Sequence, residues 1–123
     1  KEKGQRRILN FGHTFGHALE KLVGLPHGQA VSLGMVTAAA MSVQRGLLSE
    51  AEHFRLISLL QAFRLPTRLE PLGLVPRDLL QAMFRDKKRE GDTLHLVLLH
   101  GLGRAVIQPM SLIELEETLP CLL

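Results

Sequence analysis

The segment between residues 28 and 45, GQAVSLGMVTAAAMSVQR, limits the fold more than any other part of the sequence. It is apolar or small at almost every position, so a helix formed over it has no polar face to present to solvent. Such a helix has to lie at the centre of the fold. Its longest apolar run, residues 30–43, is interrupted by serine, glycine and threonine and does not reach membrane-spanning length. We therefore expect a buried central helix rather than a membrane span.

Helical patterns lie on both sides of this central segment. The apolar spacing before it predicts a first helix over residues 8–22, which Gly24 caps and Pro26 stops. After it, the sequence SEAE at residues 49–52 is a capping box for a third helix that ends near Phe63. The first half of the chain is therefore expected to contain three helices.

The second half of the chain changes character after a further helix over residues 76–86. Two β-prone runs, TLHLVLL and RAVIQP, are joined by HGLG and predict a hairpin, and a last helix follows over residues 111–119. Because a lone hairpin is only marginally stable, it must pack on the helices. We predict a mainly α fold: one domain over residues 1–123, built as a multihelical bundle with a small β-hairpin near the C-terminus.

The charge and the cysteine content indicate the cellular location and the kinds of partner to expect. The single cysteine, Cys121, cannot form an internal disulfide, and the charged start KEKGQRR does not resemble a signal peptide, so a cytoplasmic location is expected. The net charge is +3, with basic runs that are either solvated helix ends or part of a phosphate or carboxylate site. No aromatic residues interleave with the basic ones, so we expect no nucleic-acid partner.

Three of the six histidines fall between residues 13 and 27. His13 and His17 are four apart, which places them on one helix face, and His27 follows a break that can return it beside the first helix. Imidazole is a common zinc ligand, and catalytic zinc usually has three protein ligands and one open position. From the residues alone, ordinary hydrogen-bonded histidines and a metal site with a spare histidine for proton transfer are evenly balanced.

Glycines precede two of these histidines, at Gly12 and Gly16. A glycine inside a helix lowers helix stability by roughly 1 kcal/mol relative to alanine. Two glycines in one helix therefore indicate that some other interaction requires them. We expect another backbone or a bulky ligand to approach closely at these positions.

The run RRILNFGHTFGHALE, followed by HGQAVSLGM, resembles the 3-dehydroquinate synthase signature R-x-x-x-N-x-G-H-[TS]-x-G-H-A-x-E and H-G-E-A-V-x-x-G-M. Downstream, RDKKREGDTLHLVLLHGLGRAVI resembles the family pattern D-K-K…G…L-x-x-V-L…G-x-x-x-V. The matched positions of the first two blocks are Arg6, Asn10, Gly12, His13, Thr14, Gly16, His17, Ala18, Glu20, His27, Gly28, Ala30, Val31, Gly34 and Met35. The resemblance therefore spans essentially the whole chain.

This resemblance implies the mainly helical C-terminal domain of a two-domain enzyme whose N-terminal, NAD-binding domain is absent from this chain. The whole enzyme is a carbon–oxygen lyase, expected to be a homodimer. It converts 3-deoxy-D-arabino-heptulosonate 7-phosphate to 3-dehydroquinate and phosphate in the shikimate pathway of aromatic amino-acid biosynthesis. The domain alone is expected to be inactive and to expose an apolar face where its partner domain packs.

The family's metal site maps onto the histidine cluster. The resemblance implies that His13 and His27 are zinc ligands, with cobalt as an alternative metal and with a glutamate outside this chain as the third ligand. It implies that His17 does not bind the metal but takes part in proton transfer at the substrate. Two departures from the family concern this site: the loop before His27 is short, and Gln29 replaces the usual glutamate, which removes a charge expected beside the metal.

The remaining implied site residues contact the substrate. Arg6 and Asn10 precede His13 at helical spacing, and from the DKK block Lys88, with Lys87 as second choice, is expected to reach the substrate from the other side. Cationic side chains suit a substrate that carries a carboxylate and a phosphate.

Three other interpretations stay open. A related sugar-phosphate cyclase shares the histidines and differs in the residues that contact substrate. An iron-dependent alcohol or glycerol dehydrogenase-like domain has a similar metal arrangement but usually lacks the LNFGHT run. A non-catalytic helical binding module with a vestigial site is the alternative from a different functional class.

Overall fold

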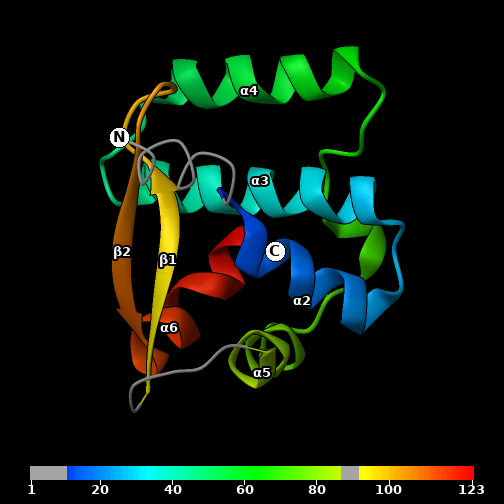
Figure 1. Ribbon diagram of the computed structural model, residues 1–123, viewed down its shortest axis with the longest axis vertical. Helices are drawn as coiled ribbons and strands as arrows, with labels where there is room; N and C mark the ends of the chain where they lie inside the picture. The colour runs from blue at the N-terminus through cyan, green and yellow to red at the C-terminus, as the bar shows by residue number, and fades with distance from the viewer. Residues whose placement is uncertain (1–10, 87–91) are drawn as a thin grey trace.

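The computed structural model describes residues 11–86 and 92–123, which form a layered arrangement of helices with one hairpin at the side (Figure 1). Its elements in chain order are α2 (His13–Val23), α3 (His27–Gln44), α4 (Glu50–Ala62), the 3₁₀ turn η1 (Glu70–Leu72), α5 (Pro76–Asp86), β1 (Thr93–Leu99), β2 (Ala105–Ser111) and α6 (Leu112–Leu122). The predicted mainly α fold with a hairpin near the C-terminus is confirmed.

Helix α3 lies at the centre of the fold, as its composition predicts. It packs against α2, α4, α6 and β1, and Figure 1 shows it between α4 and α2. The hydroxyls that interrupt its apolar run are satisfied: Thr37 Oγ1 donates to the Leu33 carbonyl and Ser42 Oγ to the Ala38 carbonyl, both at 2.8 Å. Among the described residues, no helix combines the length and the apolar character needed to cross a bilayer.

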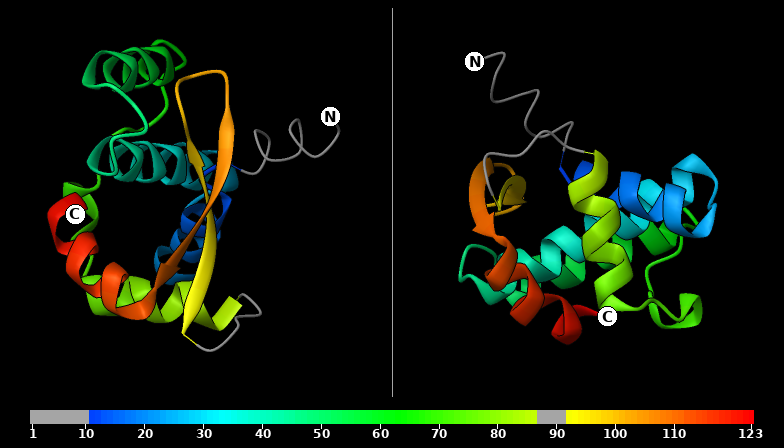
Figure 2. Two further views of the ribbon diagram at one scale, coloured as in Figure 1. Left: turned by 90° about the vertical axis from the view of Figure 1, so that its left-hand side faces the viewer. Right: turned by 90° about the horizontal axis from the view of Figure 1, so that it is seen from below.

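The hairpin packs on the helices through one face of β1. Its strands are antiparallel, with Leu96 opposite Gln108, and alternate residues Leu94, Leu96 and Leu98 are buried. The Leu99 N–H donates to Ser42 Oγ at 3.0 Å, which ties the hairpin to the central helix. Figure 2 shows the hairpin running along one side of the helical layers, as the instability of an isolated hairpin requires.

The start of the first helix differs from the prediction. Helix α2 begins at His13 rather than at residue 8, because Gly12 adopts a left-handed conformation with φ 75° and interrupts helical geometry. Phe11 and Gly12 lie in a turn, and residues 8–10 fall outside the described part of the chain. The helix ends where the sequence predicts, with left-handed Gly24 at its C-terminus.

Both predicted serine caps are present. Ser49 Oγ accepts a hydrogen bond from the Glu52 N–H while the Glu52 carboxylate accepts one from the Ser49 N–H, each at 3.0 Å. Ser111 and Glu114 form the same reciprocal pair at the start of α6. These pairs fix the starts of α4 and α6, since each satisfies two backbone N–H groups that a helix end otherwise leaves unpaired.

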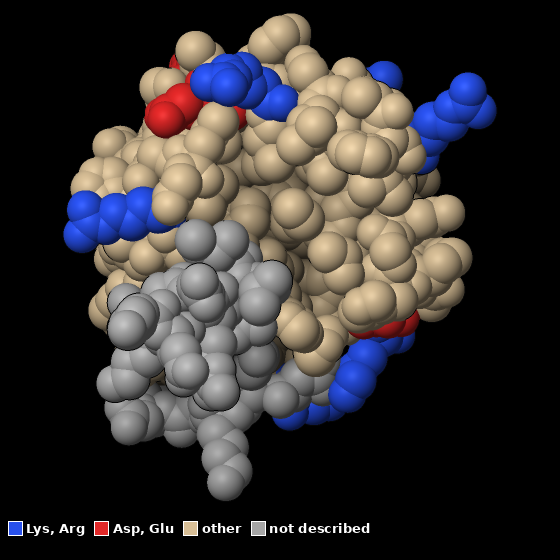
Figure 3. All heavy atoms as spheres, turned by 45° about the horizontal axis from the view of Figure 1, so that its top comes forward, with Lys and Arg blue, Asp and Glu red and all other residues tan. Residues whose placement is uncertain are grey.

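An exposed apolar face lies on α4. Phe54 is 70% exposed, Leu59 55% and Phe63 69%, which is unusual for side chains of this size. Figure 3, in which α4 comes forward, shows a broad uncharged area with the described arginine, lysine and acidic side chains at its edges.

Candidate metal and substrate site

The site is built on a very close crossing of α2 and α3. A Cβ atom added to Gly34 would lie 2.4 Å from the Gly12 carbonyl oxygen and 2.6 Å from the Gly16 nitrogen. The backbones at Gly34, Gly12 and Gly16 therefore lie so close together that no side chain fits at Gly34. Of the two expectations for these glycines, the structure shows a neighbouring backbone rather than a ligand. The crossing fixes the positions of the two imidazoles that follow Gly12 and Gly16.

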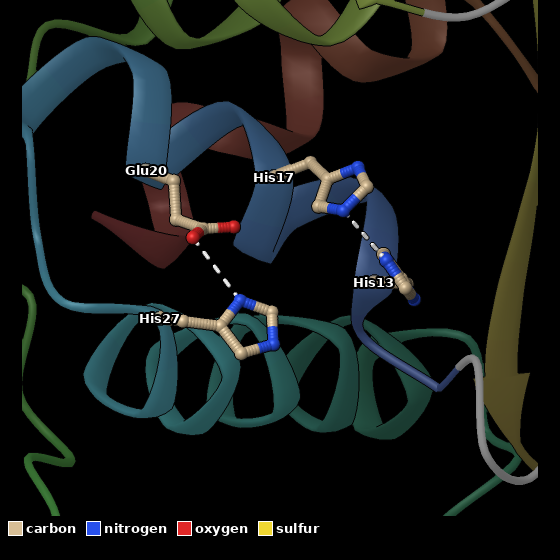
Figure 4. Close-up of polar contacts among 4 residues, drawn as sticks. All are labelled: His13, His17, Glu20 and His27. Carbon is tan, nitrogen blue, oxygen red and sulfur yellow. Dashed lines mark hydrogen bonds and ion pairs between the residues drawn. The ribbon is translucent and has the colours of Figure 1, made fainter.

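His13 and His17 lie on the same face of α2, as their spacing predicts. Their Nε2 atoms are 2.7 Å apart, and the rings meet edge to face with centroids 4.1 Å apart (Figure 4). A hydrogen bond between two ring nitrogens requires one of them to carry a proton and the other to be bare. The two half-buried rings therefore differ in which nitrogen carries the proton.

His27 returns beside the first helix through the turn at residues 24–26. The Gly24 N–H bonds the Glu20 carbonyl at 2.9 Å to close α2, and α3 then begins at His27. His27 Nδ1 lies 3.1 Å from Glu20 Oε2 on α2, so the two helices are joined by a polar contact (Figure 4). The expected reversal of the chain is confirmed.

Glu20 is a site residue to which the sequence motifs assign no role. It belongs to the matched motif, and it follows His17 by three residues, so it shares the face of α2 that carries both histidines. That spacing is a usable signal. Its contact with His27 depends on the reversal of the chain, which spacing along one helix does not reveal.

Gln29 lies away from the histidines. Residues two apart on a helix do not share a face, so His27 and Gln29 point to different sides of α3. Gln29 instead lines a hollow with the segment that follows α4, including Arg64 and Thr67. The carboxylate beside His27 is that of Glu20, and a glutamate at position 29 would not supply it.

The predicted site residues are only partly brought together within the described residues. His13 pairs with His17, and His27 with Glu20, but no group of three histidine, cysteine, aspartate or glutamate side chains in residues 11–86 and 92–123 is close enough to hold a metal ion. The substrate-binding candidates Arg6, Asn10, Lys87 and Lys88 lie outside the described residues. By chemistry, His13 and His27 fit zinc or cobalt, which bind neutral imidazole.

Comparison with known proteins places this geometry in a family. A sequence model described as 3-dehydroquinate synthase C-terminal matches residues 1–89. The chain belongs to the 3-dehydroquinate synthase C-terminal family. The 3-dehydroquinate synthase of Dichelobacter nodosus is 49% identical over 108 residues, which cover 85% of this chain and 29% of that protein. The chain spans about 30% of the length of the curated relatives that it matches.

Solved structures of related cyclases share the fold of this family. A 2-deoxy-scyllo-inosose synthase complexed with carbaglucose-6-phosphate, NAD+ and Co2+ superimposes with a TM-score of 0.76 at 27% identity, over 93% of this chain and 34% of that one. A 2-epi-5-epi-valiolone synthase from Streptomyces hygroscopicus with NAD+ and Zn2+ bound gives 0.74 at 31% identity, over 93% and 32%. The resemblance to the 3-dehydroquinate synthase family is thus confirmed, and the solved neighbours are sugar-phosphate cyclases.

Proposed function

We propose that this chain is the metal- and substrate-binding C-terminal domain of a 3-dehydroquinate synthase, a lyase that converts 3-deoxy-D-arabino-heptulosonate 7-phosphate to 3-dehydroquinate and phosphate. The observation that carries the proposal is the 49% identity to the Dichelobacter nodosus enzyme over 85% of the chain. The activity requires an NAD-binding domain, which the relatives' much greater length can accommodate. The shikimate pathway, a cytoplasmic location and a homodimeric whole enzyme belong to the same proposal.

In this proposal His13 and His27 hold zinc, or cobalt, and a glutamate outside this chain is the third ligand. The solved neighbours contain Co2+ or Zn2+, which supports a metal of this kind. When bound, such a metal supplies Lewis-acid polarisation of the hydroxyl that NAD oxidises. The imidazoles of His13 and His27 come from α2 and α3, so the close glycine crossing sets their separation.

His17 is the proposed proton-transfer residue. Its Nε2 lies at hydrogen-bond distance from His13 Nε2, 2.7 Å, and an imidazole nitrogen of this kind can exchange a proton with a substrate hydroxyl. It lies one turn from His13 on the same helix face, and the resemblance to the family assigns it to the substrate beside the metal.

Arg6, Asn10 and Lys88, with Lys87 as second choice, are the proposed substrate contacts. Guanidinium and ammonium groups match a substrate with a carboxylate and a phosphate, and the family motifs supply them at these positions.

The test uses a chimera in which this chain replaces the matched stretch of the Dichelobacter nodosus enzyme. With NAD and zinc present, it should release phosphate from 3-deoxy-D-arabino-heptulosonate 7-phosphate, while the chain alone should not. Glucose 6-phosphate tests a second candidate, because carbaglucose-6-phosphate is bound to the 2-deoxy-scyllo-inosose synthase that shares the fold. Preference for glucose 6-phosphate would assign a sister cyclase, and release from neither sugar would favour a non-catalytic module.

A further inference from the structure

The contact between Glu20 and His27 joins the end of α2 to the start of α3. His27 Nδ1 and Glu20 Oε2 are 3.1 Å apart, and the His27 side chain is 68% exposed while that of Glu20 is 29% exposed. Within residues 11–86 and 92–123, Glu20 is the only hydrogen-bond partner of the His27 side chain. Because little else packs around so exposed a ring, this contact decides how the ring is turned.

The chemistry of the pair determines which ring nitrogen is free. An ionised carboxylate only accepts hydrogen bonds, so Glu20 requires a proton on His27 Nδ1. A neutral imidazole has one N–H, so its lone pair is then on Nε2, the nitrogen that Figure 4 shows facing away from Glu20.

Helix stability does not account for the carboxylate. Glu20 lies in the last turn of α2, where the helix dipole makes a negative charge unfavourable, and Lys21 is the basic residue that suits this position. An ion pair between Glu20 and a charged His27 would contribute little to stability, because solvent screens so exposed a pair. The pair therefore needs an explanation other than the stability of α2.

We propose that Glu20 is a positioning residue that fixes the tautomer and orientation of His27, so that Nε2 is the nitrogen offered to the metal. This inference rests on the proposed role of His27 as a ligand. Histidines that bind metals usually donate their other N–H to a carboxylate or carbonyl, and the Glu20–His27 pair has that arrangement. Glu20 acts through His27 and does not itself bind the metal.

The first test is the ¹⁵N spectrum of the His27 ring in the metal-free chain at about pH 8.5, where an ordinary histidine is neutral. In the unmodified chain Nδ1 should carry the proton. Glu20→Ala should shift the ring toward a mixture of tautomers, and Glu20→Gln, whose amide oxygen still accepts a hydrogen bond, should have an intermediate effect. Glu117→Ala, at an exposed glutamate of α6, is the matched control and should change nothing. An unchanged His27 tautomer in Glu20→Ala would overturn the proposal.

The second test is zinc titration of the same chains, followed by the His27 ring signals. Glu20→Ala should weaken binding about tenfold or more, and Glu20→Gln should weaken it less. Suppose that Glu20→Gln and His27→Ala lose the same zinc affinity while the His27 tautomer is intact in Glu20→Gln. Glu20 would then itself be a ligand, and its positioning role would be overturned. If His27→Ala binds zinc normally, the ligand assignment under the proposed function fails, and the tautomer shift separately decides whether Glu20 orients the ring.

Discussion

Three imidazoles lie within one motif here, and they differ in the groups that they contact. His13 and His17 contact each other through Nε2, whereas His27 contacts a carboxylate through Nδ1. A ligand must present a bare nitrogen, while a proton-transfer residue must gain and lose a proton. The arrangement therefore allows the roles to be separated by single substitutions.

In the chimera, His13→Ala or His27→Ala should remove tightly bound zinc, because each deletes one of the proposed ligands. His17→Ala should keep zinc and lower turnover by about 10²–10⁴-fold, the usual contribution of a positioned acid or base. Metal content of the purified protein and the rate of phosphate release measure the two effects. His95→Ala, at an exposed residue of β1, is the control and should alter neither. Loss of zinc in His17→Ala would reverse the assigned roles.

Among the site residues, the sequence predicts the relations that depend on spacing along one helix and the return of His27 beside that helix, but not the contact that this return creates. The four-residue interval between His13 and His17 predicts their shared face, and both lie there. It does not predict Glu20 opposite His27, since that contact exists only after the chain reverses at residues 24–26. Position 29 also depends on tertiary structure, because Gln29 lines a hollow with the segment that follows α4, which its place next to the histidine motif does not reveal.

Between elements, the α2–α3 crossing should be the least tolerant point of the fold. Gly34→Ala places a Cβ 2.4 Å from the Gly12 carbonyl oxygen, so the two helices must separate, at a cost of about 3 kcal/mol. Gly28→Ala is the matched control on the same helix: nothing lies within 4 Å of its added Cβ, and it should be neutral or stabilising by up to about 1 kcal/mol. Urea unfolding followed by circular dichroism measures both. If the two variants were equally stable, the close backbone contact at Gly34 would not be the reason for its glycine.

The two capping boxes predict a pH dependence. The Ser49 N–H bonded to the Glu52 carboxylate lowers the pKa of Glu52, and the Ser111 N–H does the same for the pKa of Glu114. A folded-state pKa below the unfolded value gives stability that is present above the ordinary glutamate pKa of about 4.3 and is lost as pH falls through the lowered folded values.

We expect Glu52→Gln combined with Glu114→Gln to lower Tm at neutral pH, because glutamine keeps the capping hydrogen bond but has no charge. The difference from the unmodified chain should disappear in strong acid, where the glutamates are protonated too. Thermal melts across the pH range measure this, with Glu117→Gln as the control. A Tm difference that stays constant with pH would show that the charges do not contribute.

Element boundaries show why local signals succeed and fail. The capping boxes at Ser49 and Ser111 are local, and both appear where the sequence predicts them. The apolar pattern predicts a start for α2 that is too early, because nothing in the local pattern marks Gly12 as a break. Gly12 adopts a left-handed conformation where it contacts Gly34, a residue distant in the sequence. The composition of α3 is sufficient to place it at the centre, since a helix without a polar face has no other position.

For the molecule as a whole, one apolar core contains residues from every described α-helix and from both strands. The hairpin is therefore expected to unfold together with the helices. Leu98→Ala, at a residue with 0% exposure on β1, should cost about 2–5 kcal/mol and shift a single transition. Ile107→Ala, at a 45% exposed residue on β2, should cost much less.

The chain contains no tryptophan or tyrosine whose fluorescence could follow unfolding. Far-UV circular dichroism can instead follow the helices, and methyl NMR signals can follow the hairpin. Coincident melting curves from the two probes are expected for both variants. If the hairpin signals were lost well before the helical signal, the core would consist of two separately stable parts.

The glycine contact between α2 and α3 also has a consequence for genetics. In a screen that scores only lost activity, substitutions at Gly12, Gly16 and Gly34 would be grouped with those at the histidines, although a glycine has no functional group to lose. The two classes should differ in what rescues them. Excess metal should restore the activity of variants with a weakened metal ligand, whereas growth at lower temperature should restore that of variants with a strained helix crossing. The two rescue conditions would therefore separate residues that act in the chemistry from residues that hold the helices together.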